Sequence, residues 1–167
     1  VVIHCRKALP LIFDSVPRLK KLPAVIFHGW GGSPQEASAF LKKGANAYFS
    51  LGKAVLRGQK SVCAMAASFD STRLLTETDA PYMRLKSEPY SHPRDIIAVT
   101  AQCANLWYKG ADSVKQTSSD MVKRTGAIKQ YESSTVALEE ISINEAAVKE
   151  FSDMIVRNFN CAFGLSV

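Results

Sequence analysis

The 167-residue sequence lacks long apolar runs, paired cysteines and any dense block of like charge. A membrane-spanning helix needs about 20 consecutive apolar residues, and neither such a run nor a basic-then-apolar leader is found. The four cysteines are scattered without a C-x-x-C motif, which argues against a disulfide framework and against a structural zinc knuckle. These absences disfavour the membrane and secreted classes and predict reduced thiols in a cytoplasmic protein.

Composition and charge set broad limits on the class of protein. The chain is 47% hydrophobic, which is enough apolar material for one globular domain with a core. Its formal net charge of +6 favours an anionic partner such as nucleic acid, although soluble proteins without such a partner also carry moderate charge. Lysine and arginine are spread along the sequence, so any affinity for phosphate has to arise from the fold and not from a basic arm.

Short apolar runs alternate with segments of helical periodicity, and this rhythm predicts an α/β fold with a parallel sheet. Strands are expected at residues 1–4, 24–27, 45–51 and 73–77. Helices are expected at residues 8–22 with a break at Pro17, 33–44, 59–67, 94–108 ending at Gly110, and 145–163 ending at Gly164. Ser33, Pro34 and Glu36 predict a capping box at the start of the second helix.

Residues 111–144 interrupt this rhythm. Their composition shifts to serine, threonine, lysine and glutamate, which weakens both helical and strand preferences. We therefore expect residues 1–167 to form a single domain that carries a surface insertion at 111–144.

Three strand-like runs end on side chains that divalent metals favour. His4 and His28 each close an apolar run, and Asp79 follows the run at 73–77. Because parallel strands separated by helices point the same way, their carboxyl ends share one edge of the sheet. Two imidazoles and a carboxylate suit zinc, manganese or magnesium, so the sequence predicts a metal site at this edge.

The segments around these residues resemble the TatD family of metal-dependent deoxyribonucleases. His4–Ala8 is similar to the family's H-C-R-[DE]-A, and His28–Gly32 is similar to its H-C-F-[ST]-G. Leu74–Tyr82 matches the highly specific L-L-x-E-T-D-[AS]-P-Y signature, and Asn158–Leu165 resembles the terminal N-x-x-x-x-F-G-[LI].

The resemblance implies a TIM-type (β/α) barrel of the metallo-dependent hydrolase superfamily. A complete barrel needs about 250 residues, so this chain has room for about four βα units, which would correspond to strands five to eight. The H-x-H strand and the glutamate strand of the family do not occur here. We therefore expect the C-terminal half of a barrel with two open strand edges, which attract either a second copy of the chain or the missing half.

The resemblance also implies divalent-metal-dependent hydrolysis of DNA phosphodiester bonds. His4, His28 and Asp79 match the metal ligands, and Asp79 in addition matches the catalytic residue that positions or deprotonates the attacking water. The guanidinium of Arg6 suits a phosphate oxygen pair. Glu77 lies deeper on the same face of its strand as Asp79 and is expected to support the metal shell or an internal hydrogen bond.

Two alternatives remain open at this point. The chain is either an enzyme of this kind, incomplete by itself, or a truncated and diverged half barrel that acts as a catalytically inactive binding or assembly module. Trp30, beside His28, suits base stacking and ordinary core packing equally well.

Overall fold

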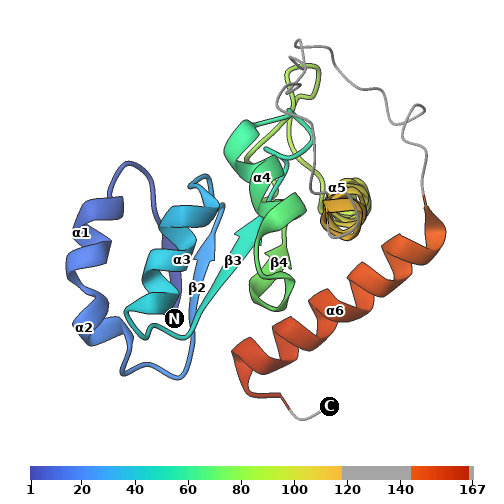
Figure 1. Ribbon diagram of the computed structural model, residues 1–167. Coiled ribbons are helices and arrows are strands. Elements are labelled where there is room, and N and C mark those ends of the chain that lie inside the picture. The colour runs from blue at the N-terminus through green and yellow to red at the C-terminus, as the bar shows by residue number, and fades with distance from the viewer. Residues whose placement is uncertain (118–143, 166–167) are drawn as a thin grey trace.

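The computed structural model describes residues 1–117 and 144–165, and the side chains of all these residues except 112–117. Its four strands form one sheet in which each strand pairs in parallel with the next along the chain. These strands are β1 (Val2–His4), β2 (Val25–His28), β3 (Ala47–Leu51) and β4 (Leu74–Thr76) (Figure 1). The predicted α/β fold with a parallel sheet is confirmed.

Helices separate the strands, as the periodicity predicts. They are α1 (Leu9–Asp14), α2 (Val16–Leu19), α3 (Pro34–Lys42), α4 (Lys60–Ser68), α5 (Ile96–Thr117) and α6 (Glu145–Phe163), with short 3₁₀ turns η1 (Ser71–Arg73) and η2 (Pro93–Asp95). The expected break at Pro17 is present, because α1 ends before Ser15 and Pro17 lies in the first turn of α2. No helix among these is long and apolar enough to span a membrane, within the described part of the chain.

Local capping explains where helix α3 begins and where helix α6 ends. Ser33 Oγ accepts a hydrogen bond from the Glu36 amide at 3.2 Å, and Glu36 Oε2 accepts one from the Ser33 amide at 2.7 Å, which is the predicted capping box. At the other end of the chain, α6 stops at Gly164, whose φ of +66° is the left-handed conformation that favours glycine. Both boundaries are confirmed.

The prediction that the fifth helix ends at Gly110 is wrong. Helix α5 continues to Thr117, because Gly110 serves close helix packing and not termination. A Cβ atom at this position would lie 1.9 Å from the backbone oxygen of Ala67 in α4. The first residues of the expected insertion therefore extend α5, and residues 118–143 lie outside the described residues, so the rest of the insertion stays a prediction.

Helices α5 and α6 do not bury all of their apolar side chains. Ile97 on α5 is 74% exposed, and Phe159 on α6 is exposed. Asn158 is buried instead, and its side-chain amide donates to the backbone oxygens of Ser71 and Leu74, both at 2.8 Å. A polar residue takes this position because it satisfies backbone groups at the start of β4.

An aromatic core fills the space between one face of the sheet and the helices. The rings of Phe27 and Phe49 stack with centroids 5.4 Å apart, and Phe40 and Trp30 pack against Phe27. Trp30 is buried within this cluster, so the structure decides in favour of the packing role over base stacking. Truncating such a buried phenylalanine to alanine typically costs about 3–5 kcal/mol.

The opposite face of the sheet carries a smaller apolar cluster. Alternation along the strands places Ile26, Tyr48 and Leu75 on this face, and Ala162 at the end of α6 packs against them. Helix α6 packs against α5 through Phe151 and Trp107 and reaches β4 through Asn158, and Figure 1 shows it passing α5 and running on below the label of β4. Each terminal strand has a sheet neighbour on one side only, and helix α6 contacts β4.

Candidate functional site

The histidine pair, His4 and His28, lies at the carboxyl edge of the sheet. The two residues are directly opposite each other in the β1–β2 register, since each is the last residue of its strand. His4 Nδ1 is 2.8 Å from His28 Nε2, and the ring centroids are 4.8 Å apart. The expected convergence of the two imidazoles is present, and their role as ligands stays a prediction.

The Glu77 carboxylate contacts His28 and the residue after it, Gly29. Its Oε1 accepts a hydrogen bond from the Gly29 amide at 2.8 Å and lies 3.4 Å from His28 Nδ1. Gly29 has a φ of +58°, a conformation that glycine adopts without steric cost and that turns its amide toward the carboxylate. With its proton on Nδ1, facing the carboxylate, His28 accepts the hydrogen bond from His4 Nδ1 through Nε2. A carboxylate behind one ring nitrogen is the usual support of a ligating histidine.

Asp79 is not grouped with the histidine pair. It is half-buried, has a φ of +53°, and its backbone oxygen accepts a hydrogen bond from the Tyr82 amide at 2.7 Å. Among the residues that the structure describes, no three or more His, Cys, Asp or Glu side chains are arranged to hold a metal ion. The structure therefore brings together two of the three predicted ligands.

The histidine pair fits part of a metal site and not a whole one. Neutral imidazole nitrogens are common ligands for zinc and other transition metals, but a catalytic zinc site uses three protein ligands. Two imidazoles can contribute to such a set, and the remaining ligands are not assembled around them in the described residues. Arg6, the predicted phosphate ligand, is exposed two residues after His4.

A second polar cluster at the same edge was not predicted. Lys53 follows the end of β3, and its side chain is 0% exposed. Its Nζ donates to Asp95 Oδ2 at 2.7 Å and also to Glu88 Oε2. The only local signal in the sequence is a basic residue just after an apolar strand, because the two carboxylates lie 35 and 42 residues further along the chain. We call these three residues the Lys53 cluster.

The charges in the Lys53 cluster stabilise one another. Burial by itself would lower the pKa of Lys53, but hydrogen bonds and charge from Asp95 and Glu88 outweigh it and raise that pKa above its ordinary value. The hydrogen bond from Lys53 lowers the pKa of Asp95. The pKa of Glu88 is also lowered, since the hydrogen bonds from Lys53 and from the Leu85 amide exceed the opposing effect of burial.

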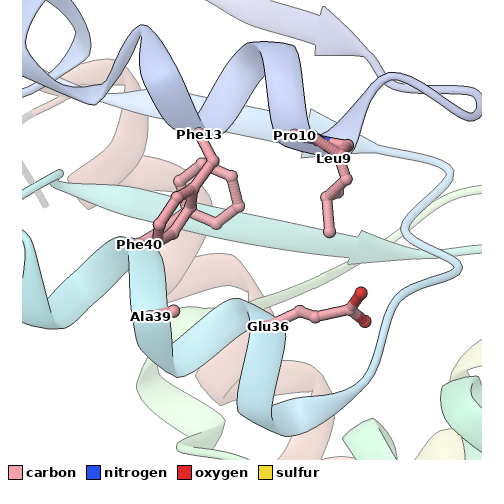
Figure 2. Close-up of a pocket in the computed structure, with 6 residues that line it drawn as sticks. All are labelled: Leu9, Pro10, Phe13, Glu36, Ala39 and Phe40. Carbon is pink, nitrogen blue, oxygen red and sulfur yellow. The ribbon is translucent and has the colours of Figure 1, made fainter.

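An apolar pocket of about 280 Å³ lies between α1 and α3. Leu9, Phe13 and Phe40 line it together with Pro10, Ala39 and Glu36 (Figure 2). None of the predicted site residues borders it, so the candidate site is the carboxyl edge of the sheet and not this pocket.

A parallel α/β sheet with polar side chains at the carboxyl ends of its strands is the architecture in which barrel and doubly wound enzymes build their sites. A family model described as TatD related DNase matches residues 1–125. The chain therefore belongs to the TatD-related DNase family, as its motifs predict.

Individual relatives agree with this assignment and are longer than this chain. The 3'-5' ssDNA/RNA exonuclease TatD of Pectobacterium parmentieri is 34% identical over 84 residues, which cover 50% of this chain and 32% of that protein. Among solved structures, YJJV, a TatD homolog from Escherichia coli, has a TM-score of 0.66 at 19% identity and covers 99% of this chain and 50% of its own. An uncharacterized amidohydrolase from Saccharomyces cerevisiae has a TM-score of 0.53 at 14% identity, covering 71% of this chain and 52% of its own. This chain thus spans about half or less of these relatives, and the structural matches show a shared fold.

Proposed function

We propose that this chain forms the C-terminal half of a TatD-type barrel, strands five to eight, and takes part in divalent-metal-dependent hydrolysis of DNA phosphodiester bonds. The observation that carries the proposal is the histidine pair, which lies in register at the carboxyl edge of a sheet within the family match. The family, the named nuclease relative and the position of the pair all support this function.

Each predicted site residue has a role in this proposal. His4 and His28 would hold a magnesium, manganese or zinc ion, and Glu77 keeps the Nδ1 proton of His28 so that Nε2 stays available. Asp79 would add a metal ligand and orient the attacking water, and Arg6 would hold a phosphate oxygen. A bound divalent cation would supply charge neutralisation at the phosphoryl group and a lowered pKa for its water.

The open edge of the sheet supports a proposed partner. Val2, the first residue of β1, and Val1 before it are exposed, and β1 has a strand on one side only. Such an edge pairs readily with another strand, which would come from the other half of the barrel or from a second copy of the chain. The remaining ligands would come from the same partner. A cytoplasmic location stays part of the proposal, in keeping with the four free cysteines.

A second candidate function is a catalytically inactive binding or assembly module. The specific observation in its favour is that the described residues bring together two predicted ligands and not three. In this case the open edge at β1 and the carboxyl edge of the sheet would bind partners, and no bond would be hydrolysed.

A nuclease assay separates the two functions. Single-stranded and duplex DNA are incubated with the full chain and magnesium or manganese, with excess chelator as the blank. The first function predicts metal-dependent cleavage that Asp79→Asn lowers by about 100-fold or more. Asp14→Asn, which changes an exposed carboxylate at the end of α1, serves as the matched control and should leave the rate unchanged.

The outcomes are distinct. Equal cleavage by the wild-type chain and Asp79→Asn would remove the proposed mechanism. No cleavage by either protein, with the chain folded by circular dichroism, would show that the chain alone is inactive, which both the inactive module and an enzyme that needs its partner half predict.

A further inference from the structure

The loop between β4 and α5, residues 77–92, exposes two tyrosine rings. Tyr82 is 71% exposed and Tyr90 is 49% exposed. Single exposed aromatic residues are ordinary on protein surfaces. These two lie on one loop that begins with Glu77, whose carboxylate lies 3.4 Å from His28 Nδ1, and the Tyr90 ring also packs on His92 with centroids 4.6 Å apart.

Ion pairs and hydrogen bonds hold the loop in place. Lys53 pairs with Glu88 in the loop and with Asp95 at the end of η2, just before α5. Glu88 Oε2 also accepts from the Leu85 amide at 2.8 Å, and the Ser91 amide donates to the Pro81 oxygen at 3.0 Å. Loops of this length without regular structure are usually either functional or disordered, and the contacts above order this one. A loop fixed in advance loses less conformational entropy when it binds a ligand.

The outer surface of the loop is cationic. Arg84, Lys86 and Arg94 are exposed. Between residues 80 and 94 the sequence contains one acid, Glu88, and its charge is compensated by Lys53. Arg84 Nη1 also donates to the Glu88 backbone oxygen at 2.9 Å, which ties this arginine to the loop. The same loop therefore carries both positive charge and exposed aromatic rings.

We propose that this loop is a binding platform for single-stranded nucleic acid, on which Tyr82 and Tyr90 stack against bases while Arg84 and Lys86 contact phosphates. The inference rests on the proposed function and adds a substrate-binding site to it. Aromatic stacking combined with cationic side chains is the chemistry by which proteins hold unpaired strands, since every base has a π face. A duplex hides those faces, so unpaired strands are the preferred ligand.

Fluorescence anisotropy of a labelled 12-nucleotide oligothymidine tests the platform. The full chain is used in excess chelator, so that binding is measured without metal and without cleavage. Tyr82→Ala and Tyr90→Ala should each raise Kd by about 5-fold or more, and Tyr82→Phe and Tyr90→Phe should retain most of the affinity. Tyr108→Ala is the matched control, because Tyr108 is also exposed, at 43%, but lies on α5.

The salt dependence separates stacking from phosphate contact. Arg84→Gln should lower the slope of log K against log salt by about 0.7 for a single strand, and the tyrosine variants should leave that slope unchanged. A Kd raised equally by Tyr108→Ala, equal affinity for a duplex of the same length, or no binding by the wild-type chain would each overturn the inference. Because no metal is present, these results are independent of whether the chain cleaves DNA.

Discussion

The Lys53 cluster and the histidine pair occupy the same edge of the sheet, but they differ in how completely their polar groups are satisfied. Lys53 is fully buried and faces two carboxylates, so the cluster balances its own charge. His4 is exposed and hydrogen bonds to His28 across the strand ends, and the pair completes no metal set among the described residues. The comparison predicts that the self-contained Lys53 cluster serves the stability of the fold, and that the histidine pair serves ligand binding.

Removing Lys53 is expected to produce the largest effect. Lys53→Met leaves Glu88 and Asp95 facing each other without a cation. Breaking a fully buried pair typically costs about 3 kcal/mol or more, and because the two carboxylates are 30% and 19% exposed, we expect a loss of about 2 kcal/mol. The free energy of unfolding from urea denaturation measures the loss. His4→Ala, which truncates an exposed side chain of the other cluster, should change it by about 0.5 kcal/mol or less. Similar losses for the two variants would contradict the comparison.

The fold was predictable wherever local chemistry decides structure. The capping box at Ser33 and the stop at Gly164 follow from residues within one turn of the helix end. Parallel strand direction then made the approach of His4 and His28 predictable, because both close neighbouring strands.

Features that depend on distant partners were not predictable in the same way. Gly110 looked like a helix stop, but its role is set by Ala67 of another helix. Lys53 meets its carboxylates only after the chain has passed through α4 and β4. The position of Asp79 depends on the turn that starts with its own left-handed backbone, so the spacing of the motif alone did not show whether it joins the histidines.

Zinc binding tests whether the histidine pair retains ligand capacity. Zinc titrated into the wild-type chain should raise its melting temperature, since a ligand that binds only the folded state stabilises that state. His28→Ala should lower the zinc affinity by about 10-fold or more, because it removes a ligand that Glu77 orients. Isothermal titration calorimetry measures this affinity.

The third histidine provides the control for zinc. His92→Ala removes an imidazole from the β4–α5 loop and should leave the zinc affinity unchanged. Equal losses for His28→Ala and His92→Ala would indicate adventitious surface binding and would remove the distinction between the two clusters.

The pH dependence of stability gives a smaller and more specific test of the Lys53 cluster. Because the folded-state pKa of Lys53 is raised, its contribution is complete below the ordinary value of 10.5 and is lost as pH rises through the higher folded value. The lowered pKa values of Asp95 and Glu88 give contributions to stability that are present above their ordinary values of 3.8 and 4.5. These contributions are lost as pH falls through the folded values.

The difference in unfolding free energy between the wild-type chain and Lys53→Met should therefore stay constant from about pH 5 to about pH 9 and shrink in acid. Urea denaturation across this range measures the difference, and a step near pH 6 to 7 would mean that a histidine, and not the three charges of the cluster, controls it.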